Sequence, residues 1–281
     1  MTFKPTTTLG YQGSQTSLVR ATCLYIATKL GDIMDDLVIV GGLVPSLLID
    51  QEALPSGVEA HVGTMDLDLG LSVLLLNEER YRSLTARLRS AGFEQDVNEA
   101  GNPTRQRWVI EKPARVTVDF LIAPTRPGDR GGKLRDIEPD FAALIAPGLQ
   151  LAFEDQVKVT LGGTTLLGEK AKRNVRVCGP GAYLVLKSFA LRLRGENKDA
   201  YDLYYVLRNY GSGPSELALR FQSLLHDTTA QQALGYLRED FEHEDSIGPS
   251  RAAEFLLKGE GDEIRADAVA FARAFLSEIA K

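Results

Sequence analysis

The chain has 281 residues, of which 44% are hydrophobic and 25% are charged, and its formal net charge is −6. This composition is typical of a folded soluble protein and excludes disordered chains, collagen-like repeats and disulfide scaffolds. No apolar run reaches the roughly 18 residues of a membrane span, and the polar N-terminus does not resemble a signal peptide. Cys23 and Cys178 lie far apart in apolar stretches, which predicts buried reduced thiols. We therefore expect a cytoplasmic protein with no membrane partner.

Positive charge is concentrated in one part of the sequence. Residues 170–210 hold nine Lys/Arg against three Asp/Glu, whereas the stretches before and after them are each acidic. An acidic chain with one basic segment indicates a local anionic partner, for which phosphate groups are the obvious candidate. The alternative is that these cations pair with neighbouring acids.

The N-terminal part of the sequence alternates between helical and strand patterns. Its Ser17–Leu30 segment has apolar residues at helical spacing and ends at Gly31. Apolar runs and alternation predict strands at 37–40, 65–73, 105–111 and 115–122, and short strands within 149–177. The other expected elements are helices at 43–49 and 78–90, connections at 50–63 and 124–136, and a turn at Gly162-Gly163.

The pattern becomes helical throughout after Pro180, a residue well placed to open a helix. The expected helices lie at 180–194, 198–210, 215–226, 229–241, 250–257 and 263–280. We therefore predict an α/β (α+β) fold class in two domains, with a mixed sheet and flanking helices in residues 1–175 and a helical bundle in residues 176–281.

Two carboxylates lie close together on one predicted strand. Asp66 and Asp68 project from the same face, about 6.5–7 Å apart at their Cα atoms, while Leu67 and Leu69 point into a core. Carboxylates this close repel each other unless a cation lies between them. Asp119 adds a third carboxylate in an otherwise apolar strand, where an unpaired charge is costly. The three acids predict a site for Mg²⁺ (or Mn²⁺) of the kind used in phosphoryl or nucleotidyl transfer.

A glycine pair, Gly41-Gly42, directly follows the predicted strand 37–40. Without Cβ atoms, these residues let backbone N–H groups approach a phosphate closely, and the start of the following helix adds a favourable partial charge. Ser46, one turn later, is a further candidate contact. The alternative is a tight turn between a strand and a helix.

The glycine pair and the three acids together resemble the signature of the polymerase-beta-type nucleotidyltransferase superfamily, which has a GG or GS turn, a D-x-D pair and a third Asp. The approach to the pair, His61-x-x-Thr64-x-Asp66-x-Asp68, is similar to the Arg-x-x-Thr-x-Asp-x-Asp form of the AbiEii-like branch, with His61 in place of the usual Arg.

This resemblance implies a nucleotidyltransferase catalytic domain in residues 1–175. In that comparison Asp66 and Asp68 bind Mg²⁺, and Asp119 completes the metal site or deprotonates the attacking hydroxyl. The residues that the comparison places at the bound nucleotide in this domain are Gly41, Gly42, Ser46 and Thr64.

A second group of polar residues lies on the first two helices predicted for residues 176–281. Lys187 and Arg194 are seven residues apart and therefore share a helix face. Lys187 lies in a mostly apolar helix, which fits a phosphate-binding lysine better than one that snorkels to water. Asp199 and Asp202 share a face of the next helix. For Lys198, the alternative to a ligand contact is a simple i, i+4 salt bridge with Asp202.

These helices resemble the second and third motifs of the AbiEii-like (AbiGii-like, MenT-like) family of nucleotidyltransferase toxins, in which L-x-x-K-x-x-A-x-x-x-R precedes K-D-x-x-D-L. The matching residues are Lys187, Ala190, Arg194, Lys198, Asp199, Asp202 and Leu203. The resemblance implies that Lys187 is catalytic and holds the triphosphate of an NTP. It implies that the nucleotide pocket is shaped by Arg194, Lys198, Asp199 and Asp202.

The loop expected at 124–136 follows the Asp119 strand directly and carries four cations, Arg126, Arg130, Lys133 and Arg135. One interpretation is a flap that binds the phosphates of an RNA acceptor. The alternative is a mobile solvated loop.

The leading hypothesis is an Mg²⁺-dependent transfer of an NMP from an NTP to an acceptor hydroxyl. By resemblance, the acceptor is RNA, at the 3′ end of tRNA, and the protein is a toxin with a cognate antitoxin. One alternative is nucleotidylation of a small molecule, as in antibiotic-modifying relatives. Another is a nucleotide-binding regulator without turnover, although all three acids are present.

Overall fold

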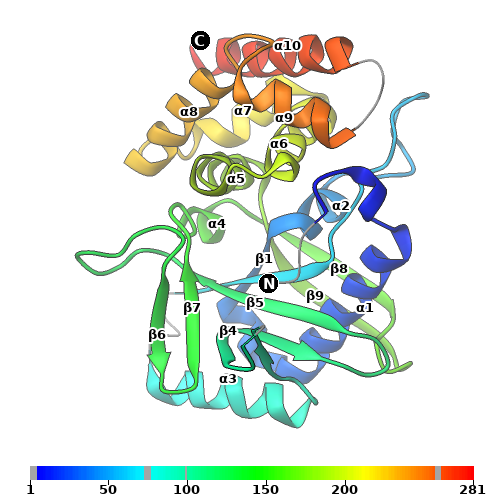
Figure 1. Ribbon diagram of the computed structural model, residues 1–281, viewed down its shortest axis with the longest axis vertical. Helices are drawn as coiled ribbons and strands as arrows, with labels where there is room; N and C mark the ends of the chain where they lie inside the picture. Colours follow the sequence, from blue (N-terminus) through cyan, green and yellow to red (C-terminus); the bar gives the residue numbers. More distant parts are fainter. Residues whose placement is uncertain (1–4, 73–76, 99, 257–260) are drawn as a thin grey trace. The chain divides into compact units, whose positions relative to one another are not determined.

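The computed structural model describes residues 5–72, 77–98, 100–256 and 261–281. The chain forms two compact units (Figure 1). The sheet unit consists mainly of Gly13–Val44 and Gly63–Cys178. The helical unit contains Pro45–Val62 and Gly179–Lys281, together with an N-terminal segment that ends at Gln12. The division after Cys178 lies three residues beyond the expected boundary, and the sequence pattern did not assign the two earlier segments to the helical unit.

The sheet unit is built on a mixed sheet, in which the described residues form nine strands. The strands are β1 (Leu37–Val40), β2 (Asp66–Leu71), β3 (Glu94–Val97), β4 (Pro103–Ile110), β5 (Val116–Ile122), β6 (Leu134–Glu138), β7 (Phe141–Ile145), β8 (Gln156–Thr164) and β9 (Lys170–Cys178). The main order is β3-β4-β5-β2-β1-β9-β8, with β7 also paired to β5 and β6 paired to β7. Together with the helices of the second unit, this confirms the predicted fold class.

The register of the central strands aligns the acidic positions. Strands β1 and β2 are antiparallel, with Val40 opposite Asp68. Strands β2 and β5 are parallel and place Asp68 beside Asp119. Strands β4 and β5 are antiparallel and place Arg107 opposite Asp119. Residues that are far apart in the sequence therefore meet on neighbouring strands.

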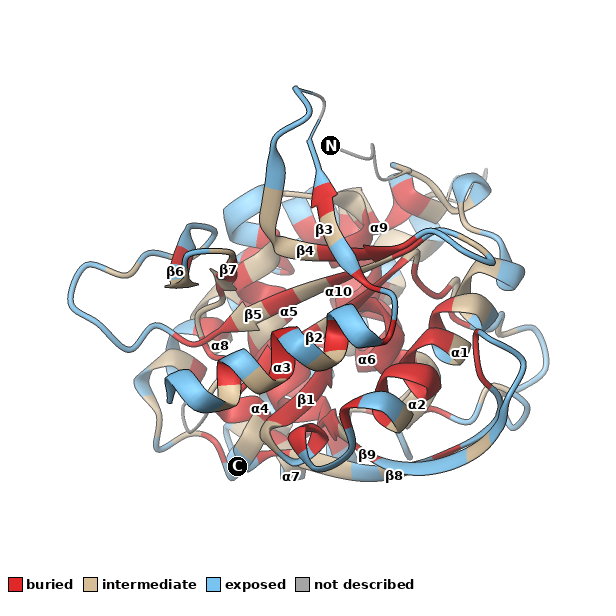
Figure 2. Ribbon diagram, turned by 90° about the horizontal axis from the view of Figure 1, so that it is seen from below, coloured by how far each residue is buried: buried red, intermediate tan, exposed pale blue. Residues whose placement is uncertain are grey.

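Helices α1 (Gly13–Leu30), α3 (Glu78–Ser90) and the short α4 (Leu151–Glu154) belong to the same unit. Asn77 caps α3, because its side chain accepts a hydrogen bond from the backbone of Glu79. The central strands are largely buried (Figure 2). The free thiols of Cys23 and Cys178 are buried in this unit, as expected, and Trp108 is also buried there.

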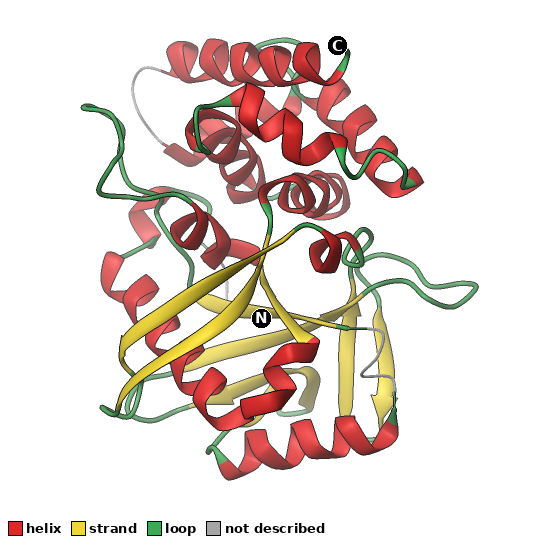
Figure 3. Cartoon of the chain, turned by 180° about the vertical axis from the view of Figure 1, so that it is seen from behind, coloured by secondary structure: helices red, strands yellow, loops and turns green. Residues whose placement is uncertain are grey.

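The helical unit contains a run of helices from Pro180 onward (Figure 3). They are α5 (Pro180–Arg194), α6 (Asn197–Asn209), α7 (Pro214–Gln222), α8 (Thr228–Asp240), α9 (Ile247–Leu256) and α10 (Gly261–Ile279). Gly195 ends α5 in the left-handed conformation that favours glycine. Among the described residues, none of the helices is both long enough and apolar enough to cross a membrane.

Several local expectations were wrong. The strands β3, β6 and β7 were not predicted, and β6 begins inside the expected loop 124–136. Gly162 and Gly163 lie within β8 rather than in a turn. Most of β3 is solvent-accessible, and β3 lies at one end of the main sheet order, so it lacks the apolar pattern that identifies a strand. The strand predicted before Gly162 is present as β8, but its exposed last residues, which include both glycines, continue the strand. The last residue of the strand expected at 65–73 and of the helix expected at 250–257 lie outside the described residues.

Candidate metal centre

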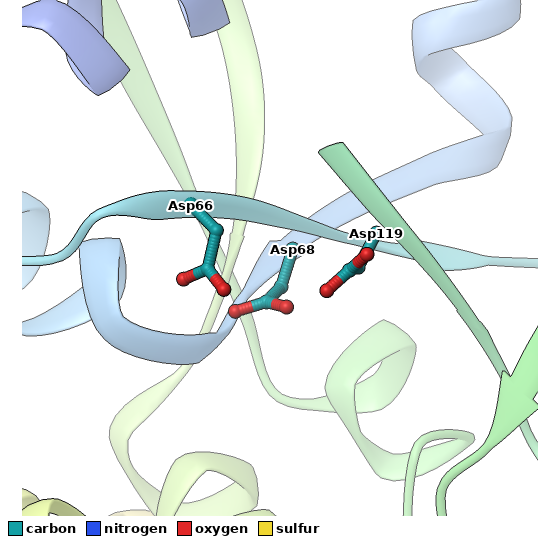
Figure 4. Close-up of side chains that lie close together, drawn as sticks. All are labelled: Asp66, Asp68 and Asp119. Carbon is teal, nitrogen blue, oxygen red and sulfur yellow. The ribbon is translucent and has the colours of Figure 1, made fainter. Parts of the chain in front are cut away.

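Three aspartates gather on the sheet, from strands β2 and β5 (Figure 4). One carboxylate oxygen of each of Asp66, Asp68 and Asp119 lies within 4.8 Å of the other two. The predicted alternation is confirmed, because Leu67 and Leu69 are fully buried on the opposite face. The register of β2 against β5, which the sequence analysis did not specify, thus brings all three acids to one place.

Thr64 precedes β2 and fixes the first of these acids. It is buried, and its hydroxyl lies 3.0 Å from Oδ1 of Asp66, to which it donates a hydrogen bond. Its backbone N–H donates to the hydroxyl of Thr16 at 3.2 Å. A residue expected to contact the nucleotide therefore orients a carboxylate of the acidic cluster.

Gly41 makes room for the second acid. Its φ of +70° lies in the left-handed region. A Cβ at this position would overlap the carboxylate of Asp68. Gly42 is buried, and the helix that follows, α2 (Val44–Leu48), has only five residues, so its dipole is small. Position 41 therefore requires glycine for two reasons, its positive φ and the space that the Asp68 carboxylate occupies.

Asp119 is held by an arginine that the sequence analysis missed. Arg107 Nε donates to Asp119 Oδ1 at 2.7 Å, and Arg107 Nη2 donates to Oδ2 at 2.6 Å. The hydrogen bonds to Asp119 raise the pKa of Arg107, and the nearby charges of Asp66 and Asp68 add to this effect. The signal was available in the sequence, because positions 107 and 119 are equidistant from Pro113 between the two expected strands.

The acidic cluster suits a divalent cation. Carboxylate oxygens are the hard donors that Mg²⁺ and Mn²⁺ prefer, and an Mg²⁺–oxygen bond is about 2.0–2.1 Å. Oxygens within 4.8 Å of one another need only small side-chain rotations to reach a shared ion. The residues present therefore fit a divalent metal ion.

In the helical unit, helices α5 and α6 bring a buried lysine against two buried carboxylates. Lys187 Nζ lies 2.9 Å from Asp199 Oδ1 and 2.6 Å from Asp202 Oδ2. Both aspartates are fully buried. The shared face that the i, i+3 spacing predicts for them is thus directed at Lys187.

Three further side chains complete this buried cluster. Arg194 donates to both oxygens of Asp199 at 2.6 and 2.7 Å. Lys198 Nζ lies 2.8 Å from Asp202 Oδ1, so the i, i+4 salt bridge considered from the sequence is present. His61 Nε2 donates to the same oxygen at 2.9 Å, and its ring stacks on Tyr201.

Burial and charge shift the ionisation of these groups in opposite directions. Burial lowers the pKa of His61 to about 4, so its imidazole is neutral at neutral pH. Burial alone would lower the pKa of Lys187, but Asp199 and Asp202 raise it above its usual range. Lys187 and Arg194 hold the pKa of Asp199 at about 2 against the effect of burial. The cluster therefore keeps Lys187 and Asp199 charged at neutral pH.

The predicted site residues fall into both units. Gly41, Gly42, Thr64 and the three aspartates belong to the sheet unit, whereas Ser46, Lys187, Arg194, Lys198, Asp199 and Asp202 belong to the helical unit. Gly41 and Thr64 contact the aspartates of the sheet unit, and the charged residues of the helical unit contact one another. Ser46 is half-buried on α2.

Most of the basic loop after β5 is exposed, but one of its four cations is buried. Arg135 is buried and donates to Thr125 Oγ1 at 2.8 Å and to the carbonyl of Ala123 at 3.1 Å. It also pairs with Asp129. Arg135 therefore ties the loop to its own backbone, which removes it from the set of cations available to an acceptor.

The sequence matches no protein-family model and no curated protein. Among solved structures, the chain is similar to an antigenic nucleotidyltransferase-like protein from Paracoccidioides brasiliensis, with 17% identity and a TM-score of 0.43. The match covers 86% of this chain and 95% of that one. At this level of similarity, the function of this chain has to be inferred from its own residues.

Proposed function

We propose that this protein is an Mg²⁺-dependent nucleotidyltransferase that moves an NMP from an NTP to an acceptor hydroxyl. The observation that carries this proposal is the convergence of Asp66, Asp68 and Asp119 on adjacent strands, with ligand oxygens within 4.8 Å. Gly41, which leaves room for Asp68, and Thr64, which orients Asp66, support it.

The reaction joins the acceptor oxygen to the α-phosphorus and breaks the bond between that phosphorus and its bridging oxygen. Pyrophosphate leaves, and the proton of the acceptor hydroxyl passes to a base. A bound Mg²⁺ would neutralise charge on the phosphates and clamp the reacting oxygens. Asp66 and Asp68 would hold the cation. Asp119 suits an anionic ligand better than a base, because both its oxygens already accept hydrogen bonds from Arg107.

The nucleotide and acceptor assignments rest on the motif resemblance. We propose that Lys187, kept charged by its carboxylate neighbours, binds the triphosphate of the NTP. Arg194, Lys198, Asp199 and Asp202 would hold that lysine and contribute to nucleotide binding. The proposed acceptor is RNA, at the 3′ end of tRNA, and the proposed role is that of a toxin controlled by an antitoxin in the cytoplasm.

The decisive experiment incubates the purified protein with Mg²⁺, each α-labelled NTP in turn, and total tRNA. We expect label to enter RNA with the wild type and not with Asp66→Asn/Asp68→Asn. Asp136→Asn, an exposed acid of the same sheet, serves as the matched control and should retain transfer. Label in the protein itself, or no label despite NTP binding, would contradict the RNA assignment. Transfer that survives in the double variant would contradict the catalytic site.

The toxin role has a separate test. Expression in a bacterial host should arrest growth, and Asp68→Asn should relieve the arrest at equal protein levels. Resistance to an aminoglycoside without growth arrest would instead identify a small-molecule acceptor.

A further inference from the structure

The hairpin of β8 and β9 has one basic face that the proposed reaction does not use. Its register places Lys158 opposite Arg176, Gly162 opposite Lys172 and Thr164 opposite Lys170. Because residues opposite each other in an antiparallel pair share a face, these cations lie on one side of the hairpin. The two strands contain no acidic residue.

The other face of the hairpin packs against the protein. Leu161, Val175 and Val177 are buried there, and helix α1 lies against both strands. Lys158, Lys170 and Lys172, by contrast, are exposed. The strands therefore present their basic side to solvent. Figure 2 draws much of β8 as exposed or intermediate.

The cations on this face are poorly compensated. Arg176 has a carboxylate, from Asp35, at 3.8 Å. Within the part of the chain that the structure describes, Lys158, Lys170 and Lys172 have no carboxylate within ion-pair distance. Like charges directly opposite each other, as in Lys158 and Arg176, destabilise a sheet. A stability cost of this kind, in a chain of net charge −6, indicates an anionic partner.

The polar residues between the cations indicate what that partner is. Thr160 and Asn174 lie opposite each other on this face, 2.8 Å apart between Oγ1 and Oδ1. Hydroxyl, amide and cationic side chains are the groups that contact phosphate and sugar in nucleic-acid complexes. A protein partner would require apolar or aromatic anchors at the centre of the face, and the exposed strand positions of this face hold none; the exposed Leu167 lies in the connecting turn. The i, i+2 spacing spreads the cations from Lys170 to Arg176 over about 20 Å, enough for several phosphates.

We infer that the basic face of the β8–β9 hairpin binds the phosphate backbone of an RNA strand and is the docking surface for the acceptor. The identification of the strand as RNA, and as the acceptor, rests on the proposed function, whereas binding of a nucleic-acid backbone does not. Contacts of this type hold the strand without reading its sequence.

The test compares two full-length quadruple variants. The first replaces Lys158, Lys170, Lys172 and Arg176 with Gln. The control replaces Arg82, Lys112, Arg238 and Lys281, which are exposed cations elsewhere, with Gln and so has the same net charge. The probes are fluorescein-labelled tRNA, single-stranded DNA of equal length, and vesicles of anionic lipid. Binding is measured by anisotropy or co-sedimentation over a series of salt concentrations, with thermal unfolding as the check on folding.

We expect the hairpin variant to bind tRNA at least about tenfold more weakly than the control. Its dependence of log K on log salt should be shallower by roughly 0.7 for each lost phosphate contact, and DNA binding should weaken in parallel. Its melting temperature should not fall, because repulsion is relieved. Equal tRNA binding by the two variants, binding of the wild type to vesicles alone, or unfolding of the hairpin variant would overturn the inference.

The same proteins separate this inference from the proposed function. If Asp66→Asn/Asp68→Asn still binds tRNA and the hairpin variant does not, the surface stands even where no label transfer is found. If label transfer occurs with equal tRNA affinity in both quadruple variants, the proposed reaction is supported and the proposed RNA-binding face of the hairpin is rejected.

Discussion

Arg107 and Asp119 face each other across β4 and β5, and the guanidinium donates to both carboxylate oxygens at 2.7 and 2.6 Å. The two side chains are 21% and 15% exposed. The arginine thus neutralises the third acid of the cluster when no cation is bound, and a bound cation has to share Asp119 with it.

Replacing this arginine should make the protein more dependent on metal. In Arg107→Gln, three carboxylates face one another with less compensation, so we expect the metal-free protein to lose about 1–3 kcal/mol of unfolding free energy. Mg²⁺ should then raise the melting temperature more in the variant than in the wild type. Calorimetry with and without Mg²⁺ measures both effects.

Arg105→Gln is the matched control, because Arg105 lies on the same strand and pairs with the exposed Asp136. Surface pairs of this kind contribute little, so its melting temperature should follow the wild type. An identical Mg²⁺ response in Arg107→Gln and Arg105→Gln would remove Arg107 from the metal site.

Gly41→Ala should weaken metal binding with only moderate loss of stability. The positive φ costs roughly 1–2 kcal/mol for any residue with a Cβ. In addition, the new methyl group would displace the Asp68 carboxylate. We expect Mn²⁺ binding, measured by electron paramagnetic resonance, to weaken at least about tenfold, which corresponds to a free-energy change of about 1.4 kcal/mol.

The control for this prediction is Gly128→Ala. Gly128 also has a positive φ, of +90°, but a Cβ there meets no atom within 4 Å. It should show the strain without the loss of Mn²⁺. If both variants bind Mn²⁺ like the wild type, Asp68 has room to move and the close packing of Gly41 is not functional.

The buried cluster predicts a fall in stability at mildly acidic pH. The unfolded chain protonates His61 below about pH 6.5, whereas the folded chain does so only below about pH 4, since burial lowers this pKa. Between these values the unfolded state binds more protons than the folded state. The unfolding free energy therefore decreases as the pH is lowered from 6.5 to 4, by about 3 kcal/mol in total. Asp199, with a pKa of about 2, supplies stability above pH 3.8 that is lost only as pH falls through 2.

Urea unfolding at several pH values between 7 and 4 measures this slope. His61→Gln keeps a donor for Asp202 but does not titrate, and should flatten the slope. His226→Gln, at an exposed site, should retain it. A His61→Gln protein that loses stability as steeply as His226→Gln would show that another group titrates.

Asp202→Asn should be the most destabilising single change in the helical unit. It removes the charge that compensates Lys187 and Lys198, and breaking one side of a buried ion pair costs about 3–5 kcal/mol. Asp267→Asn, which disturbs an exposed pair with Arg208, should cost about 0–1 kcal/mol. Equal urea midpoints for the two variants would contradict the claim that Asp202 compensates the charges of Lys187 and Lys198.

Local patterns predicted much of this structure, and long-range pairing explains where they failed. The alternation around Asp66 and Asp68 and the helix starting at Pro180 follow from nearest neighbours in the chain, and both are as expected. The bidentate partner of Asp119 depends on the register of β4 against β5, which requires reading the two strands as one hairpin and not each by its own alternation. The contact of His61 with Asp202 joins positions 141 residues apart, and no spacing rule connects them.

The helical unit includes residues 45–62, although this segment lies between β1 and β2 of the sheet unit in the sequence. His61 of this segment bonds to Asp202, and its Gln51 accepts a hydrogen bond from Tyr205. Neither unit is therefore a continuous stretch of the gene. A recombination event with a breakpoint near residue 178 would deliver the late helices without the segment that completes them. The two units are therefore not modules that a single cut in the chain can separate.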